Sequence, residues 1–202
     1  SNQKKLLNMK KFLIILLFFN FSYSNVDSIE PDVFVQSTVN RASKVLSTDA
    51  SLKNKISELR KIAKDTVDIN GIGFYTLGSF RKNLNDIKKK EYLVLFEQYF
   101  LKSFSSRLSE WTNPEINVNS KKVINKNYTI VSSILKGTNE RPEVKIDWRV
   151  YTKNPNSPLI RDVIIEGLSL ARTQKEEFAS ILNSNDEDIE ALFKILKEFT
   201  GA

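Results

Sequence analysis

Two Ser-x-x-Lys motifs are the first residues of this chain whose types and spacing could do chemistry. Ser79-Phe-Arg-Lys82 and Ser133-Ile-Leu-Lys136 both match a pattern in which a serine nucleophile is paired with a lysine. Neither motif is accompanied by the Ser-Asp-Asn and Lys-Thr-Gly elements that penicillin-recognising enzymes add. Because so short a pattern arises readily in a chain rich in Lys and Ser, we interpret both motifs as chance matches.

A partial nucleophile elbow and an acid pair are the remaining catalytic candidates. Gly167-Leu-Ser-Leu-Ala171 lacks the final glycine of the elbow, and the chain contains no His to serve as the base of a triad. Asp162 and Glu166 are spaced so that, in a strand, both carboxylates would point to one face, as the acid pair of a glycosidase-type hydrolase requires. Structural or solvated carboxylates are the commoner reason for such spacing, and a histidine-free carboxylate hydrolase is kept as an alternative.

The absence of His and Cys removes whole classes of function. A sequence with neither residue type cannot build a His-activated nucleophile, a thiolate or His-ligated zinc site, or a disulfide framework. These classes of function are therefore excluded, whereas a hydrolase that uses carboxylates alone stays open.

The N-terminal segment 1–24 is typical of a secretory signal peptide. Two lysines follow Met9, which looks like the natural start, and they precede a short apolar run over residues 12–19. Residues 22–24, Ser-Tyr-Ser, fit a small-x-small cleavage site. The apolar run is shorter than the roughly 20 residues that span a bilayer. We predict Sec export to the periplasm with cleavage after Ser24.

The net charge depends on that cleavage. The chain carries a formal charge of +7, but segment 1–24 holds four basic residues and no acid, so its removal leaves 27 basic against 24 acidic residues, or +3. A mildly basic protein offers little support for a nucleic-acid partner, and we predict none. No linker divides the remaining residues 25–202, which we predict to form a single domain.

The elements that must position any site begin with helices. Apolar residues recur at spacings of three and four from Pro31 to Leu46, and again from Leu52 to Ala63 after a cap at Thr48 or Asp49. A shorter element over 67–84 follows. The strongest helical pattern then runs over 88–111, with a broad stripe rich in aromatic residues.

Strands follow the helices. Two β-rich runs over 116–124 and 128–135 are joined by asparagines that favour a hairpin turn, and residues 144–150 alternate between apolar and charged. A fourth strand is expected over 159–166, and two further helices over 173–182 and 186–200, with Gly201 as the stop. The predicted fold class is α+β: N-terminal helices, a four-stranded antiparallel meander and two C-terminal helices.

Two segments, in this order, resemble the toluene-tolerance family of periplasmic phospholipid-binding proteins, typified by MlaC. The first is the Asp-, Gly- and Phe-containing stretch 67–81, followed by Tyr92-Leu-Val-Leu-Phe96. The second is Val144-Lys-Ile-Asp-Trp-Arg149, followed by the Asp-apolar-Glu-Gly-apolar-Ser pattern within 161–170. The resemblance covers residues 30–200. It departs from the family at 157–160, where a Gly-x-Trp is often found.

Membership of this family would imply that the protein is not an enzyme and that it has no catalytic residues, no cofactor and no metal ligands. Its members are monomeric carriers that hold a diacyl phospholipid between a small curled sheet and helices. They shuttle lipid between an outer-membrane lipoprotein–porin complex and an inner-membrane ABC transporter containing a mammalian-cell-entry domain, and so maintain outer-membrane lipid asymmetry. A periplasmic adaptor that carries no cargo is the alternative from another class.

If the chain is such a carrier, its inward apolar faces should form the walls of a lipid cavity. Ordinary core residues are of the same types, so each candidate could equally be core. The predicted wall residues are Phe74, Leu77, Phe96, Tyr99, Phe100, Phe104, Val144, Ile146, Trp148, Val150, Val163, Ile165 and Leu168.

Overall fold

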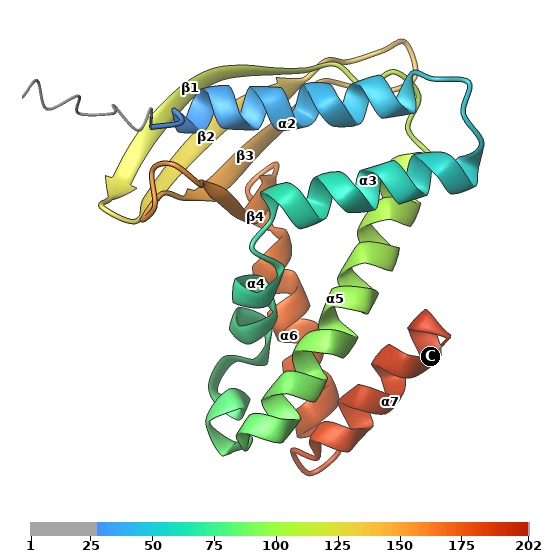
Figure 1. Cartoon of the computed structure of the whole chain (residues 1–202), viewed down its shortest axis with the longest axis vertical. Helices are drawn as coiled ribbons and strands as arrows, with labels where there is room; N and C mark the ends of the chain where they lie inside the picture. The colour runs from blue at the N-terminus through green and yellow to red at the C-terminus, as the bar shows by residue number, and fades with distance from the viewer. Residues whose placement is uncertain (1–27, 202) are drawn as a thin grey trace, which may run out of the picture.

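The computed structural model describes residues 28–201, which form a sheet and a group of helices (Figure 1). The predicted signal peptide, its start at Met9 and its cleavage after Ser24 lie outside the described residues. The helices are α2 (Pro31–Leu46), α3 (Leu52–Thr66), α4 (Ile69–Leu77), α5 (Asp86–Ser109), α6 (Leu170–Asn183) and α7 (Ile189–Thr200), with a 3₁₀ segment η1 (Gly78–Asn83). The strands are β1 (Ile116–Asn125), β2 (Tyr128–Leu135), β3 (Val144–Tyr151), β4 (Leu159–Ile165) and β5 (Leu168–Ser169).

The sheet is an antiparallel meander in the order β1-β2-β3-β4-β5. The predicted α+β class and meander are confirmed, but the sheet has five strands and not four. The extra strand, β5, is two residues long and turns back onto β4 through Glu166 and Gly167, with φ of 48° and 82°. A glycine is favoured at such a left-handed position because it has no Cβ. A two-residue strand is too short to show an alternating pattern in the sequence.

Helix starts follow ordinary capping chemistry. The Ser51 hydroxyl accepts a hydrogen bond from the backbone N–H of Asn54 at the start of α3. The prediction of Thr48 or Asp49 as this cap was wrong, because Thr48 Oγ1 instead donates to the carbonyl of Val45 in the preceding turn. At the end of α7, Gly201 adopts the left-handed conformation with φ of 75°, as the sequence predicted.

One hydrophobic core lies among α4, α5, α6 and α7. Its largest buried side chains are aromatic: Tyr92 and Phe96 from α5, Phe178 from α6 and Phe193 from α7. The Phe96 and Phe178 rings meet edge to face with their centroids 6.3 Å apart, a favoured aromatic geometry. These helices therefore form a packed layer of their own (Figure 1).

A second core lies between α2 and the sheet. Val35 and Val39 of α2 are buried against Val131 of β2 and Val150 of β3. The side chain of Gln36 also accepts a hydrogen bond from the Val118 N–H at 2.8 Å, on the outer edge of β1. The helix α2 thus covers one face of the sheet and protects part of its edge.

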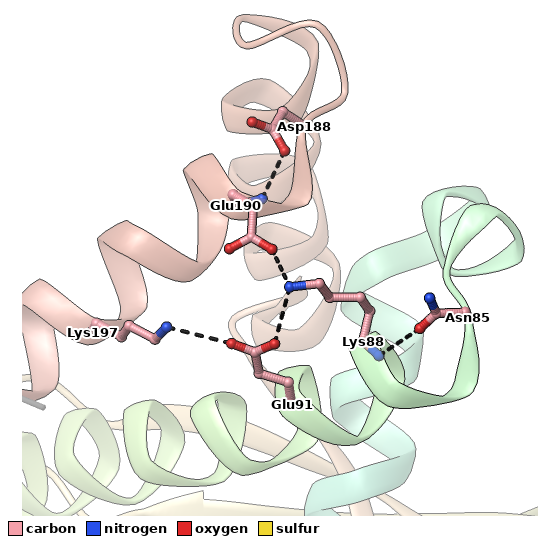
Figure 2. Close-up of polar contacts among 6 residues, drawn as sticks. All are labelled: Asn85, Lys88, Glu91, Asp188, Glu190 and Lys197. Atoms are coloured by element: carbon pink, nitrogen blue, oxygen red, sulfur yellow. Dashed lines mark hydrogen bonds and ion pairs between the residues drawn. The ribbon is translucent and has the colours of Figure 1, made fainter.

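Ion pairs join α5 to α7 on the surface of the helical layer (Figure 2). Lys88 Nζ contacts Glu91 Oε2 at 3.1 Å and also pairs with Glu190 of α7, while Lys197 Nζ lies 3.4 Å from Glu91 Oε1. The hydrogen bond to Glu190 raises the pKa of Lys88, and the hydrogen bond from Lys88 lowers the pKa of Glu91. Both groups are therefore charged over a wide pH range.

Within residues 28–201, none of the helices combines the length and the apolar character needed to cross a membrane.

Candidate functional site

The seven predicted wall residues of the strands share one face of the sheet. Side chains alternate along β3, so Val144, Ile146, Trp148 and Val150 point to the same side. Cross-strand pairing adds the others, because Trp148 lies opposite Val163, Ile146 opposite Ile165, and Ile165 opposite Leu168. We call this side of the sheet the inner face. It is the face on which α2 packs.

The inner face is only partly covered. The helix α2 lies over β1 and β2, whereas β4 lies against α4 and α6. Ile146 and Val150 are buried, but Val144, Trp148, Val163 and Ile165 are half-buried, and Leu168 keeps 59% of its surface exposed. Apolar surface is thus left accessible on the β3–β5 side of the inner face.

Five of the six predicted helical wall residues fall into two groups, and Tyr99 is described after them. Leu77 and Phe96 are each 1% exposed and belong to the helical core, where the Phe96 ring packs against Tyr92, Tyr99 and Phe178. A role for these two side chains in lining a cavity remains a prediction.

The second group lies at the margin of the helical core. Phe100 and Phe104 are half-buried, and their rings stack almost parallel with centroids 5.7 Å apart. Phe74 of α4 is also half-buried. Like Tyr99, these three aromatic side chains of the helical layer retain accessible surface.

Tyr99 joins three helices. Its hydroxyl donates to Gln174 Oε1 of α6 at 2.9 Å, and its ring lies against Phe178 of α6 and Phe199 of α7. Burial raises the pKa of the Tyr99 phenol. The structure therefore places Tyr99 between helices, with its polar end satisfied by another side chain.

The two candidate acids each accept hydrogen bonds from backbone N–H groups. Asp162 is buried and accepts hydrogen bonds from the Ser169 hydroxyl and from the N–H groups of Val163 and Ala171. Glu166 accepts from the Lys145 N–H across the sheet. Asp162 therefore fixes the start of α6, and both candidate acids have structural hydrogen-bond roles.

The serine motifs are also structural. Ser133 Oγ donates to the Ile146 carbonyl and accepts from the Trp148 indole N–H, both at 2.8 Å. Ser79 and Lys82 are exposed in the 3₁₀ segment. The role of Ser133 in orienting Trp148 was not predicted, although its place on the inner face follows from the alternation along β2.

A polar joint connects the sheet to α4. Arg161 Nε donates to Asp68 Oδ2 at 2.7 Å, and the Asp68 N–H donates to the Ile160 carbonyl at 2.9 Å. Asp68 also caps α4 through the Gly71 N–H, and a Cβ at Gly71 would lie 2.3 Å from Asp68 Oδ2. The Arg161 guanidinium lies 4.0 Å from the centre of the Tyr151 ring and donates to the Tyr128 hydroxyl.

The part of the chain that the structure describes contains no group of three or more His, Cys, Asp or Glu side chains that could hold a metal ion. A surface groove of about 500 Å³ runs along α2 and involves none of the predicted wall residues. Its lining consists of Val33, Gln36, Ser37, Asn40, Arg41 and Lys44.

Comparisons with known proteins identify a family from the sequence and a similar fold among solved structures. A family model described as "MlaC protein" matches residues 36–198. A phospholipid-binding protein from Ralstonia solanacearum, solved in complex with a phospholipid, is 18% identical with a TM-score of 0.72, and the match covers 86% of this chain and 98% of that one. No curated protein matches. At this identity the solved structure supports the fold alone.

Proposed function

Because this chain belongs to the MlaC family, we propose that it is a periplasmic phospholipid carrier. It takes a diacyl phospholipid, holds the acyl chains against the inner face of the sheet and shuttles the lipid between the outer and inner membranes. Its work would maintain the lipid asymmetry of the outer membrane. The phospholipid bound to the Ralstonia solanacearum protein of the same fold supports this class of cargo.

A carrier is needed because of the hydrophobic effect. Two acyl chains hold about 30 methylenes, and at ~0.8 kcal/mol each their exposure to water costs on the order of 24 kcal/mol. Free diffusion through the periplasm is therefore too rare to be useful. A carrier must replace most of this burial with apolar walls and must place few unpaired polar groups among them.

The observation that carries the proposal is the accessible apolar surface of the inner face. Val163, Ile165 and Leu168 are neighbours there without full burial, and adjacent accessible apolar side chains of this kind are typical of a ligand-binding surface. Two polar groups close to this surface have hydrogen-bond partners, because Ser133 accepts from the Trp148 indole N–H and Asp162 accepts from the Ala171 N–H at the start of α6. Such a surface suits acyl chains and offers no catalytic group.

The remaining parts of the proposal concern where and with what the carrier works. Segment 1–24 directs export and is removed after Ser24, which leaves residues 25–202 as one phospholipid-binding domain that acts as a monomer. Its partners are an outer-membrane lipoprotein–porin complex and an inner-membrane ABC transporter with a mammalian-cell-entry domain. Headgroups remain in water, so selectivity among them is weak.

Native mass spectrometry of the protein purified from cells tests the proposal. We expect mass increments that match diacyl phospholipids, and organic extraction should release the same lipids. Phe100→Asp should remove at least about nine-tenths of the bound lipid, because a carboxylate among acyl chains must be buried unpaired or displace them. Val94→Asp is the matched control, since Val94 lies on the same helix and is 59% exposed.

Two results would contradict the proposal. The first is a protein that carries no lipid after purification and takes none from liposomes, which would favour the adaptor without cargo. The second is lipid retention that stays unchanged in Phe100→Asp and also in a separate variant, Val163→Asp. Far-ultraviolet circular dichroism of each variant separates lost binding from lost folding.

A further inference from the structure

One end of the sheet combines positive charge with exposed aliphatic side chains. This end consists of the β1–β2 turn and the β3–β4 turn, which lie together because the Thr152 N–H donates to the Asn127 carbonyl at 2.7 Å. In Figure 1 both turns lie at the left of the molecule, far from α7. We call it the basic end and define it by Lys122, Val123, Ile124, Lys126, Arg149 and Lys153.

The charge of this end is uncompensated. Residues 116–153 hold eight basic and three acidic residues, and the two stretches 120–128 and 149–155 hold no acid. Lys121 is neutralised by Glu30 and Asp32 at the start of α2. Among residues 28–201, none of the four cations of the basic end forms an ion pair, and all four are exposed.

Two aliphatic side chains project from the same turn. Val123 is 70% exposed and Ile124 is 47% exposed. The register shifts between Val123 and Asn125, so Ile124 has no partner on β2. The sequence Lys-Lys-Val-Ile-Asn-Lys thus presents two adjacent apolar residues between lysines, at a protruding turn that nothing in the described chain covers.

Aromatic and arginine side chains stiffen the base of this turn. The Arg149 guanidinium lies 4.8 Å from the centre of the Tyr128 ring, and the Tyr128 and Tyr151 rings lie 5.3 Å apart. The turn is therefore carried on an ordered base.

We propose that the basic end docks on the surface of a bilayer that contains anionic phospholipids. Val123 and Ile124 enter the headgroup region while Lys122, Lys126, Arg149 and Lys153 face the lipid phosphates. The positive charge of the basic end is complementary to an anionic bilayer surface. Three of the four cations are lysines, which are depleted in protein–protein interfaces but are attracted to anionic lipid surfaces. The docking surface lies outside the proposed acyl-chain walls and does not depend on them.

Vesicle co-sedimentation tests the proposal. The protein is purified as the cell delivers it, with its N-terminus read by intact mass, so that all variants carry the same N-terminus. It is mixed with vesicles of phosphatidylcholine alone or with about one-third phosphatidylglycerol. We expect binding to the anionic vesicles to exceed binding to the neutral vesicles by on the order of several hundredfold, because each of the four cations contributes about a factor of five, and we expect this preference to weaken at high salt.

Variants locate the surface. Lys122→Glu/Lys126→Glu should lose on the order of 30-fold in vesicle affinity, because each lysine near an anionic surface contributes about a factor of five. Val123→Asp/Ile124→Asp should lose on the order of tenfold or more. Leu52→Asp/Lys53→Glu is the matched control and should bind as the parent does, since it places the same changes at the exposed start of α3.

Equal binding to neutral and anionic vesicles would overturn the proposal. Variants of the basic end that bind anionic vesicles as tightly as the parent does would also overturn it. Binding to an acidic protein partner in place of vesicles would also overturn it and would make this end a protein interface. Bound lipid is measured in the same samples. Variants of the basic end that keep their bound lipid but no longer bind vesicles support the docking proposal independently of the carrier function. A parent protein that carries no lipid but still binds anionic vesicles contradicts the carrier function and leaves the docking proposal standing.

Discussion

At the scale of a residue, Tyr92 shows how a buried polar group is accommodated in this protein. The side chain is fully buried in the helical core, where its hydroxyl donates to the Gly73 carbonyl at 3.0 Å and shares a hydrogen bond with Thr76 Oγ1 at 2.7 Å. Burial raises the pKa of this phenol far above its ordinary value of 10.0. The folded protein therefore keeps the Tyr92 proton at pH values where the unfolded chain loses it.

This difference predicts a loss of stability in alkali. Below pH 10 the Tyr92 phenol is protonated in both the folded and the unfolded state, so its burial contributes its full value to the free energy of unfolding. As pH rises above 10 the free energy of unfolding should fall by up to about 1.4 kcal/mol per pH unit. Tyr92→Phe should make this fall shallower, at a cost of about 1 kcal/mol near pH 7.

Urea unfolding at pH 7 to 11.5 measures both effects. Tyr75→Phe, which changes a phenol that is 42% exposed, serves as the control and should follow the parent. A Tyr92→Phe protein whose alkaline fall is as steep as that of the parent would refute this account.

At the scale of an element, the ion pairs between α5 and α7 predict a small, salt-dependent contribution. Lys88, Glu91 and Glu190 lie on the surface, where screening keeps such pairs weak. The hydrogen bond that lowers the pKa of Glu91 stabilises the fold at pH values above the ordinary pKa of 4.5. This stabilisation is lost as the pH falls below that value. The hydrogen bonds that raise the pKa of Lys88 stabilise the fold at pH values below the ordinary pKa of 10.5. This stabilisation is lost as the pH rises above that value.

Glu190→Gln should therefore lower the melting temperature by about 1–3 °C between pH 5 and 10 in dilute buffer. The difference should vanish in about 1 M salt, where the Debye length is near 3 Å. Glu198→Gln breaks a longer, more exposed pair with Lys194 within α7 and should change little. Scanning calorimetry at two salt concentrations checks this, and a difference that survives high salt would argue against an ionic origin.

Helices and strands are the features of this protein that the sequence predicted best. Helix periodicity identified α2, α3 and α5, and strand alternation placed the residues of β3 on one face, because each of these patterns has a fixed period. The short strand β5 and the cap at Ser51 were missed, since each depends on a few backbone hydrogen bonds. On α5, periodicity could not separate Phe96, which is core, from Phe100 at its margin, because that depends on which helices pack against α5.

At the scale of the whole molecule, the joint between Asp68 and Arg161 connects two separately packed parts. One core lies among α4 to α7 and the other between α2 and the sheet. The Arg161–Asp68 pair joins them directly, with side chains 29% and 18% exposed. The two residues are 93 positions apart, so no local pattern could have predicted their contact.

A double-mutant cycle tests whether this joint couples the two parts. Asp68→Asn keeps a side chain that can cap α4 but removes the charge, and Arg161→Met removes the guanidinium. Each single change should cost about 1–2 kcal/mol in the free energy of unfolding, and the double variant should cost clearly less than their sum. Arg149→Met is the control, because Arg149 stacks on Tyr128 but has no partner in α4.

Hydrogen exchange adds the structural readout to this cycle. If the joint holds the sheet against α4, Arg161→Met should speed exchange at the Asp68 amide, which donates to Ile160, more than at amides within either core. Strictly additive costs would mean that the pair adds nothing beyond its separate contacts. The sheet would then be held to the helices by packing alone, and loosening the joint would not change how readily a lipid enters between them.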